Sequence, residues 1–82
     1  MWRHRLTIYT RTGCGLCDEM HEQLVRLVDE NNHDLESISI DGDSKLQASF
    51  GDRIPVLFLD GEELCFGRLD EDLLTEALSS TR

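Results

Sequence analysis

The stretch that decides the fold is Arg11-Thr12-Gly13-Cys14-Gly15-Leu16-Cys17-Asp18. It carries two cysteines three positions apart, between an alternating run, Leu6-Thr7-Ile8-Tyr9, and a helical pattern. A Cys-x-x-Cys pair at the point where a strand passes into a helix is typical of thiol–disulfide chemistry. We therefore expect Cys14 and Cys17 to form a redox-active pair at the start of a helix.

The expected position of Cys14 favours its ionised form. Only the thiolate attacks a disulfide, and an ordinary cysteine is roughly 3% thiolate at neutral pH. The free N–H groups and the dipole at a helix N-terminus stabilise an anion by about 0.3–2 kcal/mol. Asp18 and Glu19 act against this, because nearby negative charge disfavours a thiolate, and Arg11 offsets part of their effect. We expect Cys14 to be the nucleophile and Cys17 to be the resolving cysteine.

Length and composition indicate a single globular domain. The chain has 82 residues, 39% of them hydrophobic and 30% charged, so we expect one domain over 1–82 with one modest core. The sequence shows neither an apolar run of membrane-spanning length nor a signal peptide, and we expect a cytoplasmic protein. Three cysteines, an odd number, also fit a reducing compartment better than a secreted disulfide framework.

The net charge restricts the classes of partner. Eight Lys and Arg residues against 17 Asp and Glu residues give a formal charge of −9 at pH 7. This charge disfavours nucleic acid and anionic membranes, and it slows the capture of small anions such as glutathione unless a basic group lies nearby. We expect a monomer that reacts with a disulfide-containing protein or a small thiol. We expect no metal and no tightly bound cofactor, with glutathione as a candidate reductant.

Hydrophobic periodicity in the first half predicts strand, helix, strand and helix. The strands are expected at about 4–10 and 35–40, and an amphipathic helix over about 15–30, ending near Asn31-Asn32, connects them. After a turn, a short helix is expected over 44–50.

The short helix has recognisable end signals. Ser44 and Gln47 form a capping-box pattern at its start. Gly51 follows Phe50 and is the expected stop.

The second half predicts a hairpin and a last helix. Val56-Leu57-Phe58-Leu59 is a continuous apolar run, and Asp60-Gly61 is a hairpin signal that leads into a strand over 62–66. Asp70 caps the last helix, and residues 79–82 are expected to fray. The order βαβαββα predicts an α/β fold with a four-stranded mixed sheet flanked by helices on both faces.

Arg53-Ile54-Pro55-Val56 is the second landmark, because the only proline of the sequence stands directly before the buried strand. A cis bond at Pro55 would expose the preceding backbone to an incoming extended chain. A trans proline that simply opens the strand is the alternative, and only about 5–6% of X–Pro bonds in folded proteins are cis. The residues alone leave both open.

Over nearly its whole length the chain resembles the glutaredoxin branch of the thioredoxin superfamily. The shared features are the size, the order of elements, the Cys14-Gly15-Leu16-Cys17 pair after the first strand, and Ile54-Pro55 before the third. The resemblance implies that Cys14 is the nucleophile, that Cys17 resolves, and that Ile54-Pro55 is cis beside them. Arg11 matches by charge a glutaredoxin lysine that favours the thiolate and meets glutathione. The expected substrate-binding residues are Arg11, Gly13, Gly15, Leu16, Arg53, Ile54, Pro55 and Gly67.

The chain departs from glutaredoxins in the parts that hold glutathione. It has Arg53-Ile54-Pro55 in place of Thr-Val-Pro, and Phe66-Gly67-Arg68-Leu69-Asp70 in place of a Gly-Gly-x-Asp stretch. Gly15-Leu16 is neither the glutaredoxin Pro-Tyr nor the thioredoxin Gly-Pro. The sequence is most similar to small bacterial glutaredoxin-like proteins of unassigned role.

Two other functions are compatible with the same residues. A non-catalytic thioredoxin-fold module would bind an extended peptide beside Ile54-Pro55. A metal or iron–sulfur carrier would use Cys14 and Cys17, with Cys65 or His21 as a further ligand, although no second Cys-x-x-Cys completes a zinc site. Cys65 itself is expected to be a small buried apolar residue.

Overall fold

The computed structural model describes residues 4–28 and 33–79 of the chain. Its elements follow the predicted order, which confirms the expected α/β fold. They are β1 (Arg5–Thr10), α1 (Gly15–Leu27), β2 (Asp34–Ser39), α2 (Ser44–Phe50), β3 (Val56–Leu59), β4 (Glu62–Phe66) and α3 (Glu71–Ser79). No helix in these two segments is long and apolar enough to cross a membrane.

The four strands form one mixed sheet in the order β2-β1-β3-β4. β1 pairs with β2 in parallel and with β3 antiparallel, and β3 and β4 form the predicted antiparallel hairpin. In this register Tyr9 stands opposite Val56, and Val56 opposite Phe66. The residues that follow β1, precede β3 and follow β4 therefore meet at one end of the sheet.

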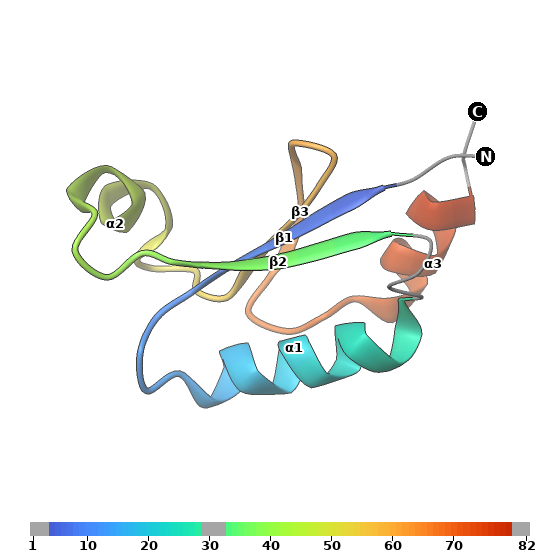
Figure 1. Cartoon of the computed structure of the whole chain (residues 1–82), viewed down its shortest axis with the longest axis horizontal. Helices are drawn as coiled ribbons and strands as arrows, with labels where there is room; N and C mark the ends of the chain where they lie inside the picture. Colours follow the sequence, from blue (N-terminus) through green and yellow to red (C-terminus); the bar gives the residue numbers. More distant parts are fainter. Residues whose placement is uncertain (1–3, 29–32, 80–82) are drawn as a thin grey trace.

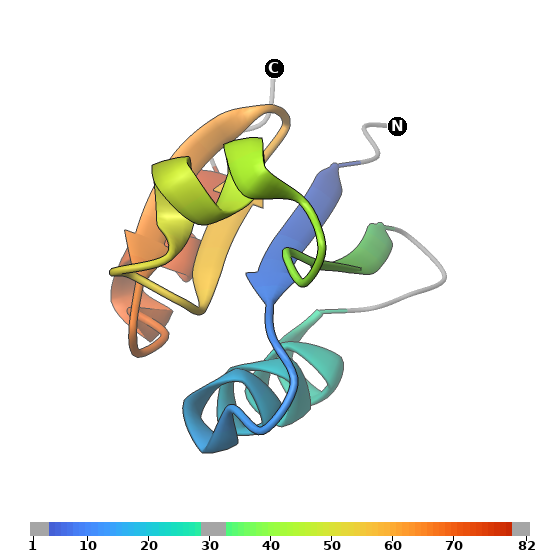
Figure 2. The ribbon, with the colours of Figure 1, turned by 90° about the vertical axis from the view of Figure 1, so that its left-hand side faces the viewer.

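α1 and α3 cover the same face of the sheet, and α2 lies on the other side, beyond the end of β1 (Figures 1 and 2). The covered face is the core. Leu6 and Ile8 from β1 and Leu57 from β3 are fully buried there. They pack with helical side chains, namely Met20, Leu24, Val28 and Leu74.

An aromatic cluster connects α2 to the opposite face of the sheet. Because side chains alternate along a strand, Tyr9 points away from the face that Ile8 occupies. The Tyr9 ring stacks on Phe50 of α2 at 4.7 Å between centroids, and it meets Phe58 of β3 edge-on at 5.4 Å. The predicted presence of helices on both faces is thus confirmed.

α1 ends at Leu27, three residues before the predicted end near residue 30. Val28 already has extended backbone angles, while its N–H still donates to the carbonyl of Leu24 at 2.8 Å. The extended backbone accompanies a Val28 side chain that is only 4% exposed and packed in the core. Tertiary packing therefore overrides the helical pattern, and Asn31-Asn32 lies outside the described residues.

The cap of α2 also differs from the prediction. Asp43, not Ser44, is the N-cap, and its carboxylate accepts the N–H groups of Lys45 and Leu46, both at 3.0 Å. The Gln47 amide donates to the Ile40 carbonyl instead of completing a capping box. An aspartate one residue earlier is as good an N-cap as serine, so the two signals compete. The helix ends at Phe50 with Gly51 as its C-cap, as predicted.

Candidate dithiol site

Cys14 is the N-cap residue of α1. Its backbone is extended, and its carbonyl accepts the N–H of Asp18 at 3.3 Å. The N–H of Cys17 donates to the Cys14 sulfur at 3.0 Å. One of the free amides at the start of the helix therefore points at this sulfur, a position from which it would stabilise the thiolate of the reduced protein.

Cys14 and Cys17 form a pair in space as well as in sequence. Their Cα atoms are 5.2 Å apart, and the two sulfurs are at disulfide-bonding distance. Cys17 is only 3% exposed, whereas Cys14 is partly exposed. A visiting molecule can therefore reach Cys14 and not Cys17.

The loop that carries Cys14 is fastened to the neighbouring loop between β2 and α2. The backbone N–H and the hydroxyl of Thr12 both donate to Oδ2 of Asp41, at 3.0 and 2.6 Å. These bonds, the hydroxyl first, hold the pKa of Asp41 below its usual value, and the charge of Arg11 adds a smaller effect. Gly13 has φ of +77°, a left-handed conformation that favours glycine, and this turns the chain from β1 into α1.

Ile54, Pro55 and Gly67 lie at the same end of the sheet as Cys14. The Ile54–Pro55 peptide bond is cis, and Pro55 is fully buried. The N–H of Gly67 donates to the Pro55 carbonyl at 2.8 Å. Pairing of β3 with β1 begins at Val56, so the backbone of Ile54 lies outside the ladder between these strands.

A family model described as "Glutaredoxin-like domain (DUF836)" matches residues 5–79. The chain belongs to this family. This glutaredoxin-like domain is 39% identical over 79 residues to the uncharacterized protein Rv0508 of Mycobacterium tuberculosis, covering 90% of this chain and 81% of that protein.

Solved structures of similar chains show the fold. Protein Ne2328 from Nitrosomonas europaea has a TM-score of 0.83 and 38% identity, with 94% of this chain and 93% of that chain covered. Thioredoxin from Fasciola hepatica has a TM-score of 0.62 and 17% identity, with 98% and 82% covered. The thioredoxin likeness shows that the glutaredoxin-like domain has a thioredoxin-like fold.

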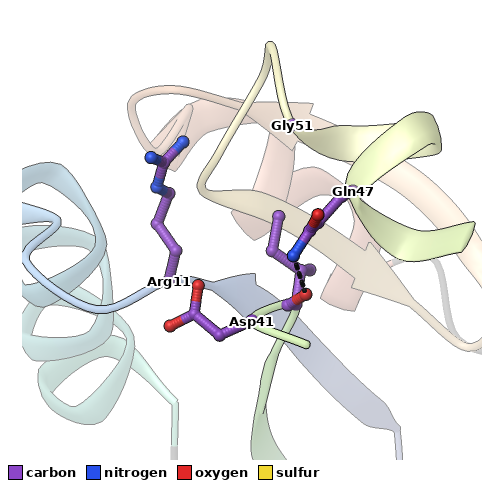
Figure 3. Close-up of a pocket in the computed structure, with 5 residues that line it drawn as sticks. Arg11, Asp41, Gln47 and Gly51 are labelled. Atoms are coloured by element: carbon purple, nitrogen blue, oxygen red, sulfur yellow. Dashed lines mark hydrogen bonds between the residues drawn. The ribbon is translucent and has the colours of Figure 1, made fainter. Parts of the chain in front are cut away.

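Arg11 lines a pocket of about 270 Å³ beside the loop that carries Cys14. Figure 3 shows its side chain extending from this loop toward the segment around Gly51, with Asp41 and Gln47 on the other walls. Gly15 and Leu16 are exposed in the first turn of α1, between the two cysteines. The structure therefore places Gly15 and Leu16 at the surface between the two cysteines, and Arg11 at the surface of the loop that carries Cys14.

Arg53 is engaged on the α2 side of the sheet. Its guanidinium pairs with the Glu63 carboxylate and donates to the Ser49 carbonyl at 3.1 Å. It also lies 5.7 Å from the ring centres of both Phe50 and Phe66. The predicted role of Arg53 in substrate binding stays a prediction, and a substrate would meet the guanidinium already paired with Glu63.

Cys65 is separate from the dithiol pair. It is a free, half-buried thiol in β4 that packs against the core cluster, and burial is the main cause of its raised pKa. Within the parts of the chain that the structure describes, no three His, Cys, Asp or Glu side chains gather as a metal site would require. Cys65 and His21 thus do not complete a metal site with the pair.

Sequence reasoning missed Asp41 as a partner of the site loop. Asp41 is 29 positions from Thr12 and stands in a stretch that reads as a simple turn. The signal that could have found it is topological. Parallel pairing of β1 and β2 puts their ends, and hence Thr12 and Asp41, side by side.

Proposed function

We propose that this glutaredoxin-like domain is a thiol–disulfide oxidoreductase in which Cys14 is the nucleophile and Cys17 the resolving cysteine. One observation carries the proposal: the more exposed cysteine of the pair is the one whose sulfur accepts a helix-terminal N–H. Access and thiolate stabilisation therefore favour the same atom. Cys17, buried and adjacent, is suited to attack from inside once Cys14 is bonded to substrate.

The reaction proceeds in two exchanges. The Cys14 thiolate attacks one sulfur of a substrate disulfide, that disulfide breaks, and the departing thiolate takes a proton from water. Cys17 then loses its proton and attacks the Cys14 sulfur of the mixed disulfide. The Cys14–Cys17 bond forms, and the second substrate thiol leaves. The substrate gains the two electrons that the dithiol loses.

The oxidised pair is reset by two molecules of a small thiol, with glutathione as the candidate, or by one dithiol reductant. Such reductants are abundant in a reducing compartment, so the proposal includes a cytoplasmic location. No resident metal or cofactor takes part in these steps.

The substrate chain is proposed to lie extended beside Ile54 and Pro55. Backbone outside the strand ladder can pair with an incoming extended chain. The Gly67–Pro55 hydrogen bond holds the two loops that border this position together. We expect Gly13 of the loop before α1, and Gly15 and Leu16 of the first turn of α1, to border it, with Arg11 as the candidate for binding an anionic group.

Reduction of an uncharged peptide disulfide by the pre-reduced protein tests the proposal. The Cys14→Ser variant should release no peptide thiol, whereas Cys65→Ser, the matched control, should match the wild type. Both variants should keep the wild-type circular dichroism spectrum. Release at the wild-type rate by Cys14→Ser would reject the mechanism. If the wild type binds the peptide without reducing it, and the Cys14→Ser/Cys17→Ser double variant binds it equally well, the protein is a non-catalytic binding module.

A further inference from the structure

We propose that the surface around Cys14 selects positively charged disulfide segments of proteins over anionic disulfides such as glutathione disulfide. The inference rests on the proposed function and adds a substrate class to it. Charged residues on four segments around the pair carry it, and together they form the rim: Arg11, Asp18, Glu19, Asp41 and Arg68.

The first turns of α1 place carboxylates next to the nucleophile. The backbone of Asp18 is hydrogen-bonded to that of Cys14, and Asp18 and Glu19 are both exposed. Within residues 4–28 and 33–79, no ion pair engages the Asp18 carboxylate. This charge is therefore available to a substrate that approaches Cys14.

The arginines at this end of the sheet are already faced by carboxylates. Arg68 pairs with Glu19 at 3.3 Å across the gap between α1 and the loop after β4. Arg53 pairs with Glu63. These two arginines consequently offer little attraction to an anion.

Arg11 and Asp41 both line the pocket in Figure 3, and the charge of Arg11 is the smallest of the causes that lower the pKa of Asp41. The hydrogen bonds from Thr12 hold the pKa of Asp41 below its usual value, which keeps this carboxylate ionised at neutral pH. The rim therefore has three carboxylates and two guanidinium groups, within a chain of formal charge −9. Its field favours cations.

Two exposed apolar side chains suit a protein segment better than a small charged thiol. Leu16 lies between the cysteines and is 38% exposed. Phe66 is 54% exposed and pairs with Val56, the residue after Pro55, with its ring beside Arg53 on the α2 side of the sheet. A basic segment with an apolar side chain near its cysteine would complement both the charge and the apolar surface. Glutathione disulfide, in which carboxylates outnumber ammonium groups, complements neither.

The test uses three disulfide-linked peptide dimers of equal length whose cysteine is flanked by lysines, serines or glutamates, together with glutathione disulfide. Single-turnover rate constants with pre-reduced protein are divided by those of the same disulfides with dithiothreitol, which removes differences in intrinsic reactivity. Electrostatic steering changes association rates by about 10- to 1,000-fold. We expect the normalised lysine-to-glutamate ratio to be at least about tenfold at about 0.01 M salt, and near one at about 1 M salt.

Two charge-reversal variants locate the effect. Asp18→Lys should lower the ratio at least about threefold, and its effect on Cys14 itself cancels because both peptides react with the same sulfur. Glu62→Lys makes the same charge change in β4, beside the hairpin at the far end of the sheet. Both variants are compared at about 0.1 M salt, where the screening length is about 10 Å, and Glu62→Lys should leave the ratio within about twofold of the wild type.

Three results would overturn the inference. They are a normalised lysine-to-glutamate ratio of one or less, glutathione disulfide reacting as fast as the lysine peptide, or an equal fall of the ratio in Asp18→Lys and Glu62→Lys. Failure to reduce the serine peptide would reject the proposed function itself. Reduction of the serine peptide without charge selectivity would reject only this inference.

Discussion

At each end of β1 an aspartate from a loop accepts two hydrogen bonds. Asp60 accepts the N–H of Arg5 at 2.8 Å and bonds the His4 ring at 2.6 Å, and Asp41 accepts both bonds from Thr12. Each arrangement holds the pKa of its aspartate below the usual value. The two ends of β1 differ in the segment to which the aspartate is hydrogen-bonded: Asp60 bonds the start of the strand, and Asp41 bonds the loop after it. Thr12 is two residues before Cys14, so the aspartate holds the start of β1 at one end and the loop of Cys14, the proposed nucleophile, at the other.

The strongest contrast is between the thiol at the reactive end and the free thiol in β4. Cys14 is accessible and receives a helix N–H, whereas burial raises the pKa of Cys65. In reduced protein at neutral pH, iodoacetamide should alkylate Cys14 at least about 100-fold faster than Cys65. Peptide mapping by mass spectrometry measures the ratio. Similar rates would remove the distinction between the two sites.

The two aspartates should differ in their effect on reactivity. Asp41→Ala frees the loop that carries Cys14, and we expect the rate of disulfide reduction to fall roughly tenfold, less than the ~100-fold that a 1 Å misplacement can cost. Asp60→Ala should leave that rate within about twofold, because its bonds lie at the other end of β1. Stopped-flow measurement with a neutral peptide disulfide gives both rates. An equal fall of the reduction rate in Asp41→Ala and Asp60→Ala would show that Asp41 acts only through the stability of the whole fold.

A matched pair of glycines sharpens the same comparison. Gly13 and Gly61 have φ of +77° and +90°, and an added Cβ would meet no atom within 4 Å at either position. Replacement of either by Ala should therefore cost about 1–2 kcal/mol in unfolding free energy through backbone strain alone. Urea denaturation measures the cost. Only Gly13→Ala should also slow alkylation of Cys14, and slowing by Gly61→Ala would contradict the account.

The smallest expected effect is on acid stability. A lowered folded-state pKa contributes stability that is fully present above the unfolded value of about 3.9 and is lost as pH falls through the folded value. Asp41→Asn and Asp60→Asn should thus be less stable than the wild type at neutral pH, and the difference should shrink in acid. Urea denaturation midpoints of the wild type and both variants, measured from neutral pH down to acid, test this difference in stability. A difference that does not change with pH would show that the carboxylate charges contribute nothing.

The sequence predicted those features that local patterns determine. The Cys14–Cys17 spacing, the hydrophobic periodicity, the helix-end signals and the Asp60-Gly61 hairpin signal together predicted every described element in order. The missed features depend on contacts between distant segments. Val28 leaves the helix where it packs in the core, and the bonds of Thr12 to Asp41 and Arg53 to Glu63 have no signature in local composition.

Trapping the mixed disulfide tests the claim that Cys14, and not Cys17, attacks the substrate. Reduced Cys17→Ser protein, in a Cys65→Ser background, would be mixed with a neutral peptide disulfide and digested for mass spectrometry. We predict that the peptide accumulates on Cys14 at close to one per chain, and that Cys14→Ser in the same background leaves Cys17 almost unmodified. Rapid modification of Cys17, or none of Cys14, would contradict the claim.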